Sequence, residues 1–185
     1  INITTGGSEA LQIALAVTCN PDDEVIVMEP FYTNYNALSL QNDVKLVPVS
    51  TSIENGFALP EISEFEKYIT PKTKGIILCN PGNPTGTLYA KETIVKLGEI
   101  VKKHNLFLYS DEVYREFCYT DEPHFSAMHL EGLEQNVILL DSVSKRYSLC
   151  GVRIGCIVSK NKEVMSGVLR FAQARLCSPA YGQIA

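Results

Sequence analysis

The chain has 185 residues, of which 45% are hydrophobic and 20% are charged, and its formal net charge is −5. Such a composition is typical of a globular domain with a sizeable core, and the mild acidity argues against nucleic-acid binding, which usually needs a basic surface. No apolar run approaches the roughly 20 residues that span a bilayer, and we expect neither a membrane partner nor a secretory signal.

Short apolar runs rich in β-branched residues alternate with segments of helical periodicity. In chain order, the patterns predict a strand over residues 1–5, a helix over 8–17, a strand over 24–28, a helix over 33–40, a strand over 44–49, a helix over 59–69, a strand over 75–79, a helix over 90–104, strands over 106–110, 137–140 and 154–158, a helix over 162–174 and the opening of another helix over 178–185. Alternation of this kind predicts an α/β fold, with a mostly parallel sheet covered by helices. We expect residues 1–185 to form one domain.

Ligands of parallel sheets bind at the carboxyl ends of the strands, so the residues after each predicted strand are candidate site residues. Gly6, Gly7, Ser8 and Glu9 follow the first strand. The glycines permit close backbone approach, and a helix N-terminus offers free N–H groups and positive dipole charge to a phosphate. The alternative is that Ser8 is only an N-cap, with Glu9 favouring the first turn.

Two further segments follow predicted strands. Residues 80–86 (NPGNPTG) contain two prolines and two glycines that fix the backbone, so Asn83 would present a rigid amide to a ligand. Residues 110–114 (SDEVY) place Asp111 at a strand end, where a buried carboxylate needs a partner such as a pyridinium N–H. A plain turn and a helix-capping Asp are the respective alternatives.

The last candidate segment carries a lysine among small hydroxyl residues, in the order Ser142, Val143, Ser144, Lys145. A lysine amine forms Schiff bases with carbonyl cofactors, and Arg153, eight residues later, can pair with a phosphate through its planar fork. Taken singly, either residue is more often a surface charge. Together the four segments match the protein side of a pyridoxal 5'-phosphate (PLP) site.

The motifs NPGNPTG, SDEVY and SVSK with a later GVRIG stand in the order that is typical of one family. The chain resembles the class I/II aminotransferases of PLP-dependent fold type I, the aspartate aminotransferase-like superfamily, over nearly its whole length. The resemblance implies a PLP-binding large domain, an enzyme that moves an amino group between an amino acid and a 2-oxo acid, and a homodimer with no nucleic-acid partner.

The resemblance also implies catalytic roles for three residues. Lys145 would form the internal aldimine with PLP and, once free, would shuttle a proton on the substrate. Asp111 would pair with the pyridine nitrogen, and Tyr114, together with Asn83, would hydrogen-bond the phenolic oxygen of the ring.

The remaining implied roles concern binding of the cofactor. Tyr32 would stack on the ring, with Phe31 as the competing assignment if the register slips by one. The residues that would hold the phosphate are Gly7, Ser8, Glu9 (through its backbone N–H), Ser142 and Arg153.

Family members usually carry an N-terminal segment and a small C-terminal domain, whose arginine binds the substrate carboxylate. Arg170 and Arg175 lie before that region and do not match the arginine. We therefore expect the chain to be an incomplete large domain, inactive or weakly active by itself. Residues 173–185 resemble a segment that contributes across the dimer interface.

Other functions use the same site. PLP enzymes of this fold include carbon–sulfur lyases and ring-closing synthases, and some transcriptional regulators use such a domain to sense PLP. A purely structural domain is a further alternative. The presence of all four site residues, Lys145, Asp111, Asn83 and Arg153, argues against it.

The cysteines and histidines match no motif. None of the six cysteines forms a C-x-x-C pair, which argues against a metal or dithiol site and predicts reduced thiols in a cytoplasmic protein. We expect His104, His124 and His129 to be structural or exposed, because none of them directly follows a predicted strand.

Overall fold

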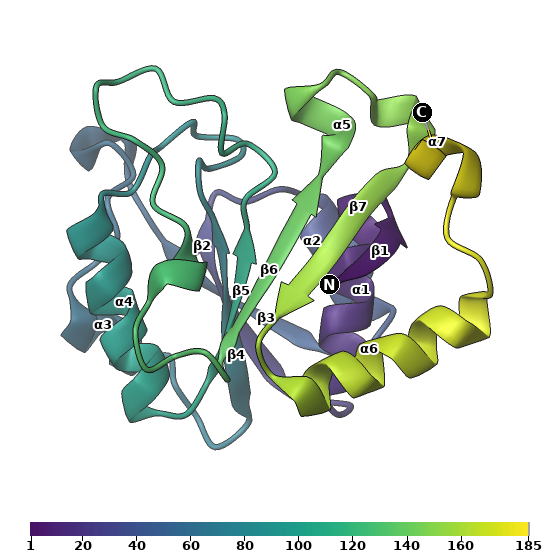
Figure 1. Ribbon diagram of the computed structural model, residues 1–185. Helices are drawn as coiled ribbons and strands as arrows, with labels where there is room; N and C mark the ends of the chain where they lie inside the picture. Colours follow the sequence, from purple (N-terminus) through teal and green to yellow (C-terminus); the bar gives the residue numbers. More distant parts are fainter. Residues whose placement is uncertain (185) are drawn as a thin grey trace.

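A computed structural model describes residues 1–184 as a seven-stranded sheet with helices on both faces (Figure 1). The strands are β1 (Asn2–Thr5), β2 (Glu24–Glu29), β3 (Lys45–Ser50), β4 (Thr73–Cys79), β5 (Phe107–Asp111), β6 (Val137–Ser142) and β7 (Ile154–Ser159). The helices are α1 (Gly6–Thr18), α2 (Asn34–Leu40), α3 (Ile62–Glu66), α4 (Lys91–Lys103), α5 (Val143–Arg146), α6 (Lys162–Arg175) and α7 (Ala180–Ile184). Short 3-10 helices are η1 (Ile53–Asn55), η2 (Ala127–His129) and η3 (Cys150–Val152).

The strand order is β1-β7-β6-β5-β4-β2-β3, and all neighbouring pairs are parallel except the two that involve β7. The predicted mostly parallel α/β fold is therefore confirmed. Because β7 alone runs backwards, its amino end lies at the same edge of the sheet as the carboxyl ends of the other strands. Residues after β1, β2, β4, β5 and β6 and residues before β7 can thus meet at one edge.

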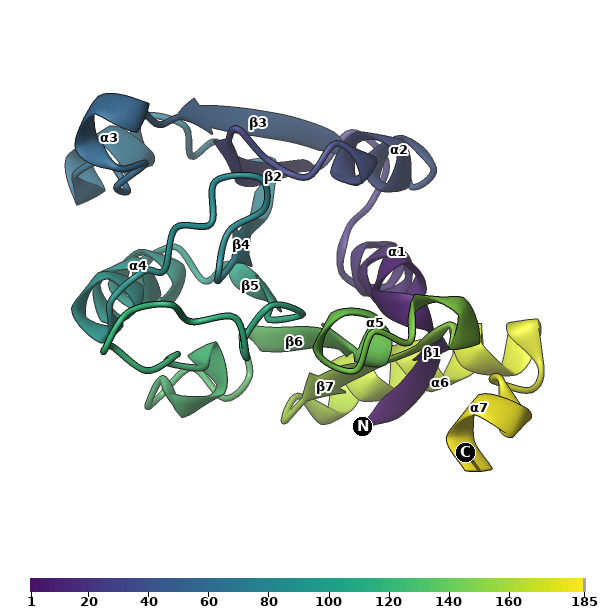
Figure 2. The same ribbon diagram turned by 90° about the horizontal axis from the view of Figure 1, so that it is seen from above.

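Two apolar layers bury the sheet on both faces, which explains why its strands read as continuous apolar runs. On one face, Ala10 and Ala14 of α1 and Val168 of α6 pack in one cluster. On the other face, Leu97 and Val101 of α4 pack in a second cluster. Figure 2 shows α4 on one side of the sheet and α1 and α6 on the other.

The predicted elements all form within residues 1–184, residue 185 of the last expected helix lying outside the described residues, and two helices depart from expectation in a way that matters here. The helix expected over residues 59–69 is reduced to Ile62–Glu66, where Phe65 is the one buried side chain. The first helix begins at Gly6 with Thr5 as its N-cap, so Ser8 lies inside the first turn and is not the N-cap. Among residues 1–184, no helix combines the length and apolar character that crossing a bilayer requires.

Candidate active site

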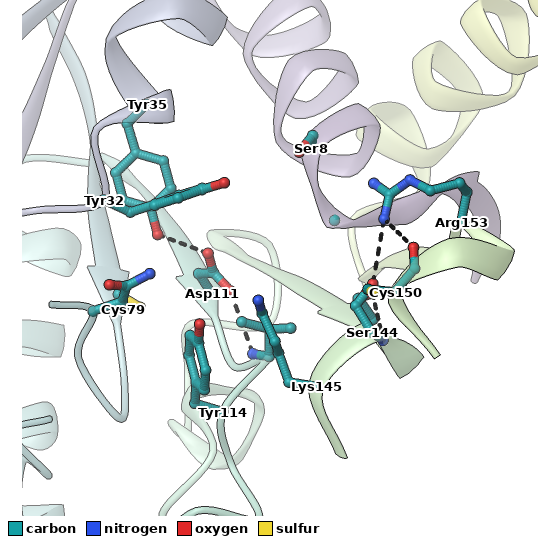
Figure 3. Close-up of a pocket in the computed structure, with 14 residues that line it drawn as sticks. Ser8, Tyr32, Tyr35, Cys79, Asp111, Tyr114, Ser144, Lys145, Cys150 and Arg153 are labelled. Carbon is teal, nitrogen blue, oxygen red and sulfur yellow. Dashed lines mark hydrogen bonds between the residues drawn. The ribbon is translucent and has the colours of Figure 1, made fainter. Parts of the chain in front are cut away.

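A pocket opens at the edge of the sheet where the strand ends meet (Figure 3). Six separate segments of the chain supply its walls, namely those that follow β1, β2, β4, β5 and β6 and the turn before β7. The lining residues are Gly7, Ser8, Tyr32, Tyr35, Cys79, Asn83, Asp111, Val113, Tyr114, Ser142, Ser144, Lys145, Cys150 and Arg153.

All predicted cofactor-binding residues except Glu9 line this pocket. The Glu9 carboxylate turns away from it, accepting the Thr5 N–H at 2.6 Å and lying 2.9 Å from Nε of Arg175. Glu9 was expected to act through its backbone N–H, and that role stays a prediction.

Asp111 is the last residue of β5, and its carboxylate faces the pocket. Its Oδ2 atom accepts a hydrogen bond from the Tyr35 hydroxyl at 2.6 Å, and Oδ1 accepts the Val113 N–H at 3.3 Å. Burial raises the pKa of the Asp111 carboxyl, and the two hydrogen bonds oppose that rise. A buried acid of this kind favours a cationic N–H donor as its ligand, because such a donor compensates the charge.

Lys145 lies in the four-residue helix α5, directly after β6. The helix begins at the N-cap Ser142, whose Oγ atom accepts the Ser144 N–H at 3.0 Å. The Lys145 amine lies 5.7 Å from the centroid of the Tyr114 ring. Figure 3 shows this amine pointing into the pocket on the side of Asp111.

Arg153 and the N-terminus of α1 form an anion cradle at the other end of the pocket. The guanidinium packs so closely on Gly6 that a Cβ there would lie 2.2 Å from Nη2 of Arg153. Its Nη1 atom donates to the Cys150 carbonyl at 2.9 Å, and within residues 1–184 it meets no carboxylate. A guanidinium without a carboxylate partner, beside a helix N-terminus, suits a phosphate group.

Tyr32 and Phe31, the two candidates for the stacking ring, lie in different surroundings. Tyr32 lines the pocket and packs edge-on against Tyr35, with ring centroids 5.5 Å apart. Phe31 instead packs against the apolar cluster between α1 and the sheet. Of the two candidates, Tyr32 is the one that borders the pocket, and its stacking role stays a prediction.

Sequence reasoning missed five lining residues, namely Tyr35, Cys79, Val113, Ser144 and Cys150. Cys79 had a detectable signal, because it ends a predicted strand. Burial raises the pKa of its thiol, and its Sγ atom donates to the Pro81 carbonyl at 3.3 Å. Tyr35 had no such signal, because it reads as an ordinary buried residue of a helix and its partner Asp111 is 76 residues away.

The donor set fits PLP on four separate counts. The pocket offers an amine for an aldehyde, a buried acid for a ring nitrogen, an aromatic face and a cationic cradle for a phosphate, each from a different segment. The group complementary to all four is an aromatic ring with an aldehyde, a basic nitrogen and a phosphate.

The family model described as aminotransferase class I and II matches residues 1–185. The chain is 36% identical over 186 residues to the putative aminotransferase YugH of Bacillus subtilis, covering 99% of this chain and 47% of that protein. It is 32% identical over 183 residues to the glutamate–pyruvate aminotransferase AlaA of Escherichia coli, covering 96% of this chain and 45% of that protein.

Solved structures show the same likeness. The aromatic aminotransferase from Pyrococcus horikoshii superposes with a TM-score of 0.92 at 28% identity, covering 98% of this chain and 48% of that one. The aspartate aminotransferase from Thermotoga maritima gives a TM-score of 0.91 at 29% identity, with the same coverage of 98% and 48%. The chain thus spans about half the length of the relatives that it matches.

Proposed function

Because the chain belongs to the class I and II aminotransferases, a PLP-dependent family, we propose that the whole protein moves an amino group between an amino acid and a 2-oxo acid. We assign residues 1–185 to its PLP-binding large domain. The observation that carries the proposal is the convergence of three residues onto one pocket: Asp111 from the end of β5, and Lys145 and Arg153 from two places in the connection between β6 and β7.

Individual residues would hold the cofactor as follows. Lys145 would bind its aldehyde through a Schiff base, Asp111 would bind the ring nitrogen, and Asn83 and Tyr114 would donate hydrogen bonds to the phenolic oxygen. Tyr32 would cover the ring face. The residues that would bind the phosphate are Gly7, Ser8, Glu9 (through its backbone N–H), Ser142 and Arg153.

PLP, when bound, supplies an electron sink that stabilises negative charge on the substrate carbon next to the amino group. The Lys145 amine, when free, would be placed to move the proton at that carbon as a general base. The Asp111 carboxylate would favour a protonated ring nitrogen by pairing with it. Tyr35, which donates to Oδ2 of Asp111, holds that carboxylate in place.

We further propose that the protein is a cytoplasmic homodimer. Its six cysteines are all unpaired, which supports a reducing compartment. Exposed apolar side chains occur along α6 and the segment after it, and exposed apolar surface suits a subunit interface. These side chains are Leu169, Phe171, Leu176, Tyr181 and Ile184.

A visible spectrum of the purified full-length protein with added PLP tests the proposal. After unbound PLP, which itself absorbs in this range, has been removed by gel filtration, wild type and Lys160→Ala, which removes a lysine distant from the pocket, should retain a band at roughly 360–430 nm, because a lysine Schiff base absorbs there. Lys145→Ala should lack the band. An unchanged band in Lys145→Ala would contradict the assignment of this lysine.

Product analysis then separates transfer from elimination. An aminotransferase converts an amino acid and a 2-oxo acid into the exchanged pair, with no net release of ammonia. Release of ammonia in place of the exchanged pair would favour the lyase alternative and contradict the proposed transfer reaction.

A further inference from the structure

We propose that Asp141 is a positioning residue that holds Lys145 and Tyr114 in a fixed relation, through ion pairs with the arginine that follows each of them. The inference deepens the proposed function and rests on it. Asp141 itself does not line the pocket, so its contribution would act through its neighbours.

Asp141 lies near the end of β6 with a side chain that is only 10% exposed. One carboxylate oxygen, Oδ2, accepts a hydrogen bond from Nη2 of Arg146 and lies 3.3 Å from Nη2 of Arg115. The other oxygen, Oδ1, accepts the backbone N–H of Ser142 at 2.7 Å. One buried carboxylate therefore holds two guanidinium groups and the N-cap residue of α5.

The residues next to these two arginines in the chain connect Asp141 to the pocket. Arg146 directly follows Lys145, and Arg115 directly follows Tyr114. Ser142, the third partner, lines the pocket itself. Each contact of Asp141 thus fixes a pocket residue or the residue next to one.

Lys145 needs such an anchor, because the helix that carries it is short. Helix α5 has four residues, and a single helical turn is not stable without tertiary contacts. The Arg146 side chain is 12% exposed and forms the buried contact with Asp141. Breaking a buried ion pair leaves an uncompensated charge, so the flanking turns should shift when Asp141 is replaced.

Glu116 offers a matched control, because it contacts the same two arginines from the surface. Its Oε1 atom lies 3.6 Å from Nε of Arg115 and 3.9 Å from Nη1 of Arg146, and its side chain is 60% exposed. Exposed ion pairs stabilise little. Glu116→Gln therefore removes the same charge from the same arginines without removing the buried anchor.

The rate at which Lys145 attaches added PLP, followed by the Schiff-base absorbance of the full-length protein, tests the proposal. We expect Asp141→Asn to slow attachment by about tenfold or more, because misplacement of a reacting group by about 1 Å is costly. Arg115→Met should also slow the attachment of PLP to Lys145. This effect is informative because Arg115 lies beside Tyr114, in a different segment from Lys145. Glu116→Gln should attach PLP at the wild-type rate.

Thermal unfolding separates positioning from general stability. If Asp141→Asn is too unstable to assay, the attachment rate of Arg115→Met tests the proposal instead. Arg115 is 33% exposed, so its replacement should destabilise the protein less. A purely structural role would lower the melting temperature and leave attachment by the folded protein unchanged, and that result would overturn the proposal. Absence of the absorbance band from wild type would instead contradict the proposed function itself.

Discussion

The Asp111 carboxyl shows how a single residue can be costly to the fold and useful to the site. Burial raises its pKa. A carboxyl whose pKa is raised by folding contributes stability that is complete below its unfolded pKa of about 4. That stability is lost as the pH rises through the folded pKa. The ionised form of Asp111 is therefore the less stable form in the cofactor-free fold.

Asp111→Asn should accordingly stabilise the cofactor-free protein at pH 7 by on the order of 1 kcal/mol, since the amide carries no charge to bury. The gain should vanish near pH 3, where the carboxyl is protonated in both states. The same change should weaken PLP binding by about tenfold or more, because the charged partner of the ring nitrogen is lost. Thermal unfolding across this pH range and a PLP titration check both effects. A lower melting temperature at pH 7 would contradict the argument.

Tyr35 stabilises the buried Asp111 carboxylate by donating a hydrogen bond to it. Tyr35→Phe should destabilise the protein by about 1–2 kcal/mol, because a buried acceptor loses its donor, and it should also weaken PLP binding. Tyr109→Phe is a matched control, since its buried hydroxyl bonds Thr18 at 2.7 Å and Tyr109 does not line the pocket. Urea unfolding and PLP titration of both variants test this. Equal losses of PLP affinity would contradict a specific role for Tyr35.

At the residue scale, the sequence could predict the groups that follow strands and could not predict the contacts between them. Lys145, Asp111 and Arg153 belong to motifs whose residue types are chemically distinctive. Tyr35 and the Asp141–Arg115 pair belong to no motif, because each contact joins residues that are far apart in the chain. Only the folded chain brings such partners together.

At the scale of elements, the approach of β7 to the start of α1 shapes the phosphate end of the pocket. A Cβ at Gly155 would lie 2.4 Å from the carbonyl carbon of Gly6 and 2.7 Å from the Gly7 nitrogen. Both contacts are with backbone, so neither can give way by a side-chain rotation. Glycine at position 155 therefore lets the Gly6–Gly7 turn lie against the strand.

Gly155→Ala should destabilise the protein by about 1–3 kcal/mol through overpacking. It should also weaken the binding of PLP, because the displaced turn carries the free N–H groups at the helix N-terminus. Gly151→Ala is the control, since a Cβ there meets nothing within 4 Å. Denaturant unfolding and PLP titration compare the two variants, and an unaffected Gly155→Ala protein would refute the packing argument.

The periodicity of the sequence predicted the strands to within about two residues, because each apolar run is bounded by turn residues. The reversed direction of β7 was not predictable, since strand direction depends on pairing and not on composition. Helix α3 is shorter than predicted. Only one of its side chains, Phe65, is buried, so little packing supports a longer helix. Local pattern thus located the elements, and long-range pairing decided their bounds and directions.

At the scale of the whole molecule, the sheet topology explains why six segments meet at one edge. Five strands deliver residues from their carboxyl ends, and the reversed β7 delivers Arg153 from its amino end. The two apolar layers stabilise this arrangement from both faces. The central claim is that the resulting pocket holds PLP covalently on Lys145.

Reduction of the PLP-loaded protein with borohydride, followed by peptide mass mapping, tests this claim most directly. Borohydride converts a Schiff base into a stable secondary amine, so the lysine that held the cofactor keeps the pyridoxyl group through proteolysis. We expect the label on the peptide that contains Lys145 and on no other lysine. A label elsewhere, or no label on a protein that binds PLP, would contradict the account.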